Sequence, residues 1–251
     1  MAIKTRKISD WLSANGQAIT NASKATMEDA IRADVGQLYD GVFIMFHRKS
    51  DDFPLAVRVS SWASYQASGE IAEGVLLVEG GRHLVIAPTE ASSAKWSSKP
   101  VSSSDTSGSV QISGVTTTDD RITALNDFAG RANTTAIING STSSNVTNTE
   151  NYAAGFCNKY SRTNANGKGL TAGRWWLPSM GEMAMIWANF DKINYALSKI
   201  SGATQLQANW YWTSTQGSAN GAWYLHLSDG TMSIYWKFLQ HRVRPVSAFL
   251  N

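Results

Sequence analysis

The chain has 251 residues, 43% of them hydrophobic, which is enough to build the core of one large domain or two small ones. Its net charge is only +3 and its basic residues are scattered, so the sequence lacks the basic patch expected of a nucleic-acid binder. The single cysteine, Cys157, excludes an internal disulfide framework and argues against a thiolate metal cluster.

Residues 1–40 are predicted to form a helical head that is separate from the rest of the chain. Apolar residues recur there at helical spacing, and Thr26 and Asp29 are placed like an N-cap residue and its partner. A helix this short needs a surface to pack on, which is either its own domain or a docking or self-association partner. Its apolar positions are Met27, Ile31, Val35 and Leu38.

Signals for secretion or membrane insertion are not visible. The basic residues near the N-terminus are not followed by the apolar core of a secretory signal. No apolar stretch approaches the roughly 18 residues of a membrane span. We therefore expect synthesis in a cytoplasm and no direct insertion into a membrane.

Residues 41–251 are predicted to form one domain, which begins with two hairpins. Residues 41–46 and 55–59 are apolar and β-rich, and polar residues at 49–52 separate them, which indicates a strand, a turn and a strand. Residues 74–78 and 83–87 form a second such pair, joined through Gly80 and Gly81. Both hairpins are expected to belong to the scaffold.

The middle of the chain alternates loops with short helices. Residues 97–118 and 139–149 are rich in Ser, Thr, Gly and Asn, and we expect long surface loops that contribute no core segment. Between and after them are two stripes of helical spacing. The first stripe is Asp120, Ile122, Leu125, Phe128 and Ala129, and the second is Tyr152, Ala153, Phe156, Cys157 and Tyr160. A free cysteine on an apolar helix face is typical of inert core rather than of a nucleophile.

A capping box marks the start of the main helix. Ser179 and Glu182 have the spacing at which the two side chains satisfy free amides of a first helical turn. Apolar residues then continue at helical spacing as far as Gly202, and a bend is expected near residues 189–191. They are Met183, Ile186, Trp187, Phe190, Ile193, Leu197 and Ile200.

From Trp210 onward the period changes to two, which predicts strands. Trp210 and Trp212 should lie on one face of a strand with Tyr211 opposite. In the next strand Trp223, Leu225 and Leu227 should lie opposite Tyr224 and His226. A turn follows at residues 228–230, and then a strand in which Met232, Ile234 and Trp236 alternate with Ser233 and Tyr235.

Four motifs in this part of the chain occur in a recognisable order. They are Trp176-Leu177-Pro178-Ser179, Trp212-Thr213-Ser214-Thr215, Ala222-Trp223 followed by Gly230, and Arg244-Pro245-Val246-Ser247-Ala248-Phe249. Their order and spacing resemble the bacterial and phage branch of the C-type lectin-like fold, and within it the variable proteins of diversity-generating retroelements, such as phage major tropism determinants. The resemblance covers about residues 40–250 and is specific only in the last eighty.

The resemblance implies an α+β fold with two main helices, short antiparallel sheets and long Ser/Thr/Gly-rich surface loops. It implies a buried framework and, at about residues 210–249, a ligand-binding surface whose side chains are exchanged by mutagenic copying of adenines. The framework residues are Trp175, Pro178, Ser179, Glu182, Trp212, Trp223, Arg244 and Pro245. The replaceable, ligand-binding residues are Gln216, Gly217, Ser218, Asn220, His226, Ser228, Ser233, Ile234, Tyr235, Trp236, Phe238, Leu239 and His241.

The chemistry of this surface suits recognition. Rigid aromatic rings provide contact area at low entropic cost, while small polar side chains adapt their hydrogen bonds. Phe238 and Leu239 are apolar in a loop that would otherwise be polar, and with Tyr235 and Trp236 they form a candidate hot spot. The alternative is that these four side chains complete the core.

Three functions are compatible with the resemblance. The first is a non-enzymatic receptor-binding protein that attaches a phage or a bacterium to a cell-surface protein or glycan, located on a virion tail or associated with a bacterial cell. The resemblance to tropism determinants implies a homo-oligomer, a trimer, for such a protein. The second is a lectin or adhesin of fixed specificity, although a calcium site is disfavoured because Asp229 is the only carboxylate of the surface. The third, an enzyme of the formylglycine-generating type, needs two cysteines where this chain has one. We expect no cofactor, no metal and no catalytic residue, and the four histidines are isolated in sequence.

Overall fold

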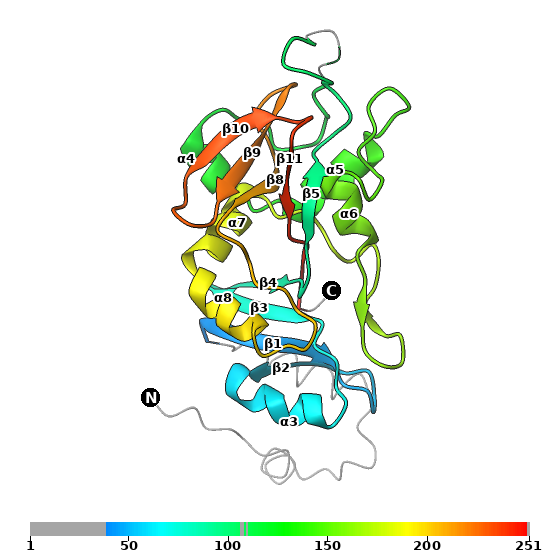
Figure 1. Ribbon diagram of the computed structural model, residues 1–251, viewed down its shortest axis with the longest axis vertical. Helices are drawn as coiled ribbons and strands as arrows, with labels where there is room; N and C mark the ends of the chain where they lie inside the picture. Colours follow the sequence, from blue (N-terminus) through cyan, green and yellow to red (C-terminus); the bar gives the residue numbers. More distant parts are fainter. Residues whose placement is uncertain (1–38, 106–107, 109, 250–251) are drawn as a thin grey trace, which may run out of the picture. The chain divides into compact units, whose positions relative to one another are not determined.

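The structure, a computed structural model, describes residues 39–105, 108 and 110–249. The chain divides between Tyr39 and Asp40 into two units, and the helices and strands of the described residues belong to the second. The helix expected over Thr26 to Leu38 lies outside the described residues. Figure 1 shows the arrangement of the labelled helices and strands.

The first sheet contains five strands in the order β12-β4-β3-β1-β2, all antiparallel. The two predicted hairpins are confirmed, because β1 pairs with β2 and β3 pairs with β4. Gly80 and Gly81 both have positive φ, which a two-residue turn between twisted strands requires. The strands are β1 (Gly41–His47), β2 (Pro54–Arg58), β3 (Gly74–Glu79), β4 (Arg82–Ile86) and β12 (Val246–Ser247).

The second sheet also contains five strands, in the order β10-β9-β8-β11-β5. Its pairs are antiparallel except that β11 runs parallel to β8, through Arg242 and Tyr211. The strands predicted after Trp210 are therefore confirmed, and β10 lies at an edge. The strands are β5 (Ala91–Lys95), β8 (Trp210–Gln216), β9 (Gly221–His226), β10 (Met232–Trp236) and β11 (Gln240–Val243). A short pair, β6 (Arg162–Thr163) and β7 (Gly169–Leu170), stands apart.

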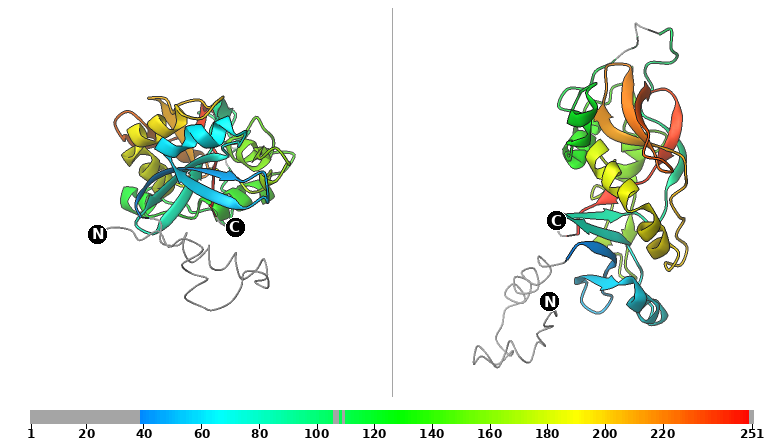
Figure 2. Two further views of the ribbon diagram at one scale, coloured as in Figure 1. Left: turned by 90° about the horizontal axis from the view of Figure 1, so that it is seen from below. Right: turned by 90° about the vertical axis from the view of Figure 1, so that its left-hand side faces the viewer.

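Six α-helices occur in the described part of the chain, so the fold is of the mixed α+β class. The predicted main helix is interrupted at Asn189, which separates α7 from α8. Helix α7 packs on the second sheet and α8 on the first, as the right-hand view of Figure 2 shows. The helices are α3 (Trp62–Ala67), α4 (Arg121–Leu125), α5 (Gly130–Asn139), α6 (Ala153–Lys159), α7 (Met180–Ala188) and α8 (Phe190–Leu197), with a 3-10 turn at Val59–Ser61.

The prediction that residues 120–129 form a helix with a buried apolar face is wrong. Helix α4 is capped by Asp120, whose carboxylate accepts from Thr123 N at 2.7 Å, but it ends at Leu125. Ile122 is 71% exposed and Leu125 is 39% exposed. Helix α5, which the stripe did not predict, follows it and carries the buried residue Ile137.

The expectation that residues 97–118 contribute nothing to the core is also wrong. The described part of this segment is free of helix and strand, but Ile112 and Val115 are buried. They belong to an apolar cluster with Trp96, Trp212 and Cys157. These apolar contacts, together with the hydrogen bond from Gln216 N to Thr116 O at 2.8 Å, hold the segment against the second sheet.

Two apolar clusters occupy opposite faces of the second sheet, as the alternation along its strands predicts. Tyr211, Trp223 and Leu225 belong to the cluster shared with α7, α8 and the first sheet. Trp212 and Tyr224 belong to the other cluster, with residues of α5 and α6. Among the described residues, no helix has the length and apolarity to cross a membrane, and no three metal-ligating side chains come together.

Candidate functional site

A row of stacked aromatic rings crosses three neighbouring strands of the second sheet. Trp210 of β8 stacks on Tyr224 of β9, with ring centroids 4.1 Å apart and planes at 24°. Tyr224 in turn stacks on Tyr235 of β10, at 5.3 Å and 19°. We call Trp210, Tyr224 and Tyr235 the aromatic row. Because each ring is supported by the next, the row is rigid, and Tyr235 at its end is 42% exposed.

Two histidines border the aromatic row. His226 meets Trp210 edge-on at 4.8 Å, and its Nδ1 is 2.7 Å from the Ser228 hydroxyl. His241 of β11 packs against Tyr224 at 4.9 Å, and burial lowers the pKa of its imidazole to about 4. The Nε2 atom of His241 is buried and has no hydrogen-bond partner among the described residues. At neutral pH His241 is therefore an uncharged ring within an aromatic cluster.

A cavity of about 370 Å³ lies beside the end of the aromatic row. We call it the β9–β10 cavity; it is lined by Ser218, Asn220, Gly221, Ile234, Tyr235 and Trp236. The turn between β8 and β9 shapes one wall, because the Ser218 hydroxyl accepts from Asn220 N at 3.2 Å and from Gly221 N at 3.0 Å. Five of these six residues are among the predicted ligand-binding residues.

Glycine is required where Ile234 packs across the turn. A Cβ atom at Gly221 would lie 2.4 Å from Ile234 Cγ2, and one at Gly217 would lie 2.6 Å from the same atom. Such distances are far shorter than van der Waals contact. The Ile234 side chain therefore fits against bare backbone and closes the inner side of the β9–β10 cavity.

Lys237 anchors the loop that joins β10 to β11. Its side chain is fully buried, and its ammonium group donates to Gln216 Oε1, to Val110 O at 3.1 Å and to Ala219 O at 3.2 Å. The ammonium also lies 4.4 Å from the centre of the Trp96 ring. Burial lowers the pKa of Lys237 from 10.5 to about 7. Phe238 and Leu239, which follow directly, are held at the surface by this anchor.

Gln216 and Gly217 do not lie on the expected surface. Gln216 is fully buried: its carboxamide accepts from Ile112 N at 3.1 Å and donates to Thr117 Oγ1 at 2.9 Å. Gly217 is also buried, because it backs onto Ile234. The resemblance implied a surface position for both residues, whereas β8, whose register with β9 is irregular between Trp212 and Gln216, continues inward as far as Gln216.

The other predicted residues lie around the aromatic row. Ser233 is opposite Tyr224 in the strand register, and both His226 and Ser228 lie at the far end of β9 from the cavity. Phe238 stacks on Trp236 with centroids 6.4 Å apart. Leu239 is half-buried, and its backbone N–H donates to Trp236 O at 3.0 Å. The structure thus brings one group together at the β9–β10 cavity and spreads the remainder along the sheet.

The predicted framework residues are all buried. Trp223 Nε1 donates to Thr118 O at 2.7 Å, and Trp212 Nε1 donates to Ala94 O at 3.1 Å. Arg244 pairs with Glu90 at 2.7 Å, and Glu90 also accepts from Arg242. These contacts tie the strands behind the aromatic row to the preceding loops. The complete set is Trp175, Pro178, Ser179, Glu182, Trp212, Trp223, Arg244 and Pro245.

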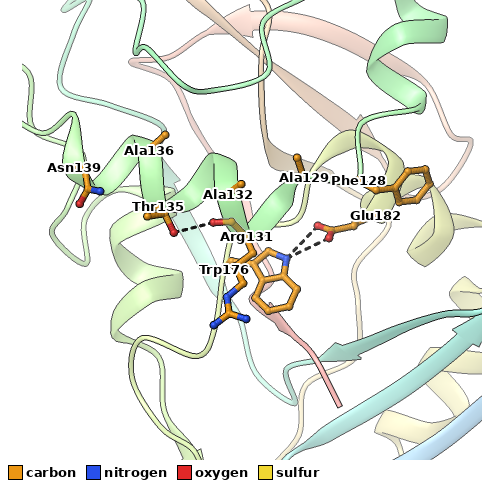
Figure 3. A pocket seen from close by; sticks show the side chains of 9 residues that line it. All are labelled: Phe128, Ala129, Arg131, Ala132, Thr135, Ala136, Asn139, Trp176 and Glu182. Atoms are coloured by element: carbon orange, nitrogen blue, oxygen red, sulfur yellow. Dashed lines mark hydrogen bonds between the residues drawn. The ribbon is translucent and has the colours of Figure 1, made fainter. Parts of the chain in front are cut away.

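A second, larger cavity of about 720 Å³ lies between α5 and the start of α7. Figure 3 shows the Trp176 ring beside the Glu182 carboxylate, with Ala132, Thr135 and Asn139 along α5. Burial raises the pKa of Glu182 to about 7. Glu182 accepts from Ser179 N at 2.8 Å and from Trp176 Nε1 at 3.1 Å, so it completes the predicted capping box. We assign Glu182 to the start of the helix rather than to chemistry.

Reactive groups near the aromatic row are few. Asp229 lies 3.6 Å from His226 Nδ1 and is largely exposed. Cys157 is fully buried in the core next to α5, where burial raises the pKa of its thiol well above the usual value. The arrangement of rings, hydroxyls and amides is chemically suited to binding.

Three residues of this site, Trp210, Tyr224 and Lys237, were absent from the predicted ligand-binding residues. Trp210 and Tyr224 lie on the same face of the sheet as Tyr235, and this shared face was readable from the alternation along the strands. Lys237 was not readable in the same way, because an isolated lysine between aromatic residues is ordinarily a solvated side chain. Only the fold shows that it turns inward.

Comparison with known proteins adds a distant likeness. No family model matches the chain, and no curated protein matches it either. Among solved structures, a fimbrial protein from Bacteroides ovatus aligns with a TM-score of 0.42 and 20% sequence identity, over 66% of this chain. The alignment spans only 36% of the length of that fimbrial protein, and a likeness of this size does not establish a shared fold.

Proposed function

We propose that this chain is a non-enzymatic binding protein that recognises a cell-surface target through the aromatic row and the β9–β10 cavity. The observation that carries the proposal is the convergence of Ser218, Asn220, Ile234, Tyr235 and Trp236 on one open cavity at the end of a rigid row of rings. A concave site with aromatic walls and a few polar groups is typical of ligand binding.

The finer proposal is that the domain is C-type lectin-like and that its surface is diversified by a retroelement. Supporting it is the separation between two sets of residues: the predicted framework residues are buried, whereas Ser218, Ser228 and Tyr235 are exposed. Side chains on the outward set can be exchanged with little effect on packing. Attachment of a phage or a bacterium to its target is a use for such a surface, and self-association into a trimer would multiply its affinity.

Binding to whole cells tests the first part. Fluorescently labelled protein would be titrated onto a panel of bacterial strains, and strains that bind would be retested with Tyr235→Ala. Tyr195 of α8 provides the matched control, because it is a second exposed tyrosine, 57% accessible, on a different element. We expect Tyr235→Ala to lose binding and Tyr195→Ala to keep it, with similar melting temperatures. Equal binding by the two variants would contradict the proposal.

Sequencing of the flanking DNA tests the second part. A near-copy of the codons for residues 210–249, differing only at adenines and lying beside a reverse transcriptase gene, is the expected arrangement. Codons in that copy should differ at exposed positions such as Ser218 and Tyr235 and agree at the buried Trp212 and Trp223. Flanking DNA with neither feature would leave a binding protein of fixed specificity.

A further inference from the structure

Strand β10 forms one edge of the second sheet, as Figure 1 shows, and half of its backbone groups point away from β9. In an antiparallel pair, residues that exchange hydrogen bonds alternate with residues that do not. His226 N donates to Thr231 O at 2.8 Å and Lys237 N donates to Asn220 O at 3.0 Å, which fixes the phase of this alternation. Every second residue of β10 therefore directs its N–H and C=O groups outward. These residues are Met232, Ile234 and Trp236.

The outward backbone groups of β10 are left almost without partners by the described part of the chain. Trp236 O accepts from Leu239 N at 3.0 Å, and no other hydrogen bond joins these groups to the described residues. The strand also contains no proline and no charged side chain, since the nearest formal charges are those of Asp229 and Lys237. An open sheet edge is a template for another strand, and proteins usually protect it with charges, proline or a covering segment.

The other edges of the two five-stranded sheets, β12, β2 and β5, have such protection. Strand β12 is covered by Trp176, whose N–H donates to Val246 O at 2.8 Å and whose C=O accepts from Val246 N at 3.0 Å. Strand β2 begins with Pro54, which has no N–H to offer. Strand β5 is met by the segment before α6, because Lys95 N donates to Asn151 O at 3.2 Å. Among the edges that the structure describes, β10 is therefore the one prepared to receive another strand.

The side chains of β10 are complementary to those of a second β10 strand. A two-fold axis at Ile234 brings the outward backbone groups of two antiparallel copies opposite one another. The facing pairs are Ile234 with Ile234, Ser233 with Tyr235, and Met232 with Trp236. On the face of the aromatic row, a small side chain thus lies opposite Tyr235, which is 42% exposed in the single chain. Facing pairs of this kind are what stabilises an added strand.

We propose that β10 is an interface for a second copy of this chain, in which the two β10 strands pair antiparallel about Ile234. The pairing gives hydrogen-bond partners to the outward N–H and C=O groups and joins the second sheets of two copies into one continuous sheet. Both aromatic rows then lie on the same face of that sheet. A second copy is favoured over an unrelated polypeptide because it supplies the matched side chains itself. The interface does not depend on the target-binding function proposed above.

The oligomeric state of the full chain tests this interface. Sedimentation equilibrium from micromolar to millimolar concentration, with no target present, should show monomers in equilibrium with dimers. Ser233→Glu places two like charges close to the two-fold axis and should weaken dimerisation about tenfold or more. Ser64→Glu adds the same charge on the exposed side of α3 and should change it by less than about twofold. Melting curves check that both variants fold. Monomers at every concentration, or equal dimerisation by two folded variants, would overturn the proposal.

Disulfide formation tests the register without a disruptive charge. Protein carrying Ser233→Cys would be mixed with protein carrying Tyr235→Cys and oxidised. The two introduced cysteines face each other with Cα atoms about 4.5 Å apart, within reach of a disulfide, whereas two identical cysteines lie diagonally at about 7–8 Å. We expect a cross-linked dimer in the mixture and far less in either variant alone. Cys157 is fully buried and does not compete. Equal cross-linking in the mixture and in the separate variants would show that the strands do not pair about Ile234.

Discussion

The buried ammonium of Lys237 donates to the buried carboxamide of Gln216, between the loop after β10 and the end of β8. Their backbones are further joined through the neighbouring turn, since Lys237 N donates to Asn220 O at 3.0 Å. A charge without a carboxylate partner is costly to bury, which explains the lowered pKa of Lys237. Folding therefore favours the uncharged form of Lys237 over the charged one.

Replacement of Lys237 by Met should change how stability depends on pH. An unfolded lysine binds its proton below about pH 10.5 and the folded one only below about pH 7, so the unfolded state holds more protons in between. The free energy of unfolding should thus rise with pH from 7 upward, by at most about 1.4 kcal/mol per unit. Urea unfolding measured between about pH 7 and 10.5 should show this rise in the free energy of unfolding for the unmodified protein and no such rise for Lys237→Met.

Glu182 should give the opposite slope at lower pH. Its pKa rises from 4.5 unfolded to about 7 folded, so the folded state holds more protons between these values. Stability is therefore greatest below about pH 4.5 and is lost as pH rises through 7, as far as this group is concerned. In Glu182→Gln, which keeps an acceptor for Ser179 N, the decline should disappear. An unchanged slope between pH 5 and 7 would show that the carboxyl is ionised throughout.

Ser179→Ala should destabilise the fold by about 1–2 kcal/mol, because it removes an N-cap side chain. Its hydroxyl also donates to Asp127 O at 2.6 Å, so the substitution leaves that buried carbonyl without this donor. Chemical unfolding should measure the loss. Ser198→Ala, whose hydroxyl bonds only within the exposed end of α8, is the matched control and should cost little. Equal losses in the two variants would contradict the role of the cap.

Gly221→Ala should close the β9–β10 cavity from within. The added methyl group would overlap Ile234 Cγ2, and the resulting displacement of Ile234 should weaken ligand binding and cost about 1–3 kcal/mol. Combining it with Ile234→Ala, which removes the overlapped Cγ2 atom, should relieve this clash, so the two substitutions together should cost less than the sum of their separate costs. A binding assay and a melting curve on the single and double variants check both effects. Unchanged ligand binding and an unchanged melting temperature in Gly221→Ala would contradict them.

Much of this architecture follows from sequence patterns, for reasons visible in particular residues. The alternation of Trp210, Tyr211 and Trp212 assigned faces correctly, because a strand between two apolar layers must display its side chains alternately. The capping box at Ser179 was equally readable, since its hydrogen bonds are local. Local rules succeed where the partners are a few residues apart.

The same sequence patterns did not reveal contacts between residues that are far apart in the chain. Nothing within the sequence near Lys237 indicates that Val110 and Trp96 enclose its side chain. Likewise, Gln216 looked like an adaptable surface amide until its contacts with Ile112 and Thr117 were seen. A buried polar group is defined by what comes from elsewhere in the chain, and spacing alone does not carry that information.

The strands β11 and β12 are the last elements in the described chain, yet each closes a different sheet. Until the ribosome has released residues 240–247, β5 lacks its neighbouring strand, apart from an isolated bridge between Lys95 and Tyr152, and β4 lacks one of its two partners. We therefore expect this domain to fold only after translation has passed that point. A chain interrupted before these residues would leave β5 and one edge of β4 without their partner strands.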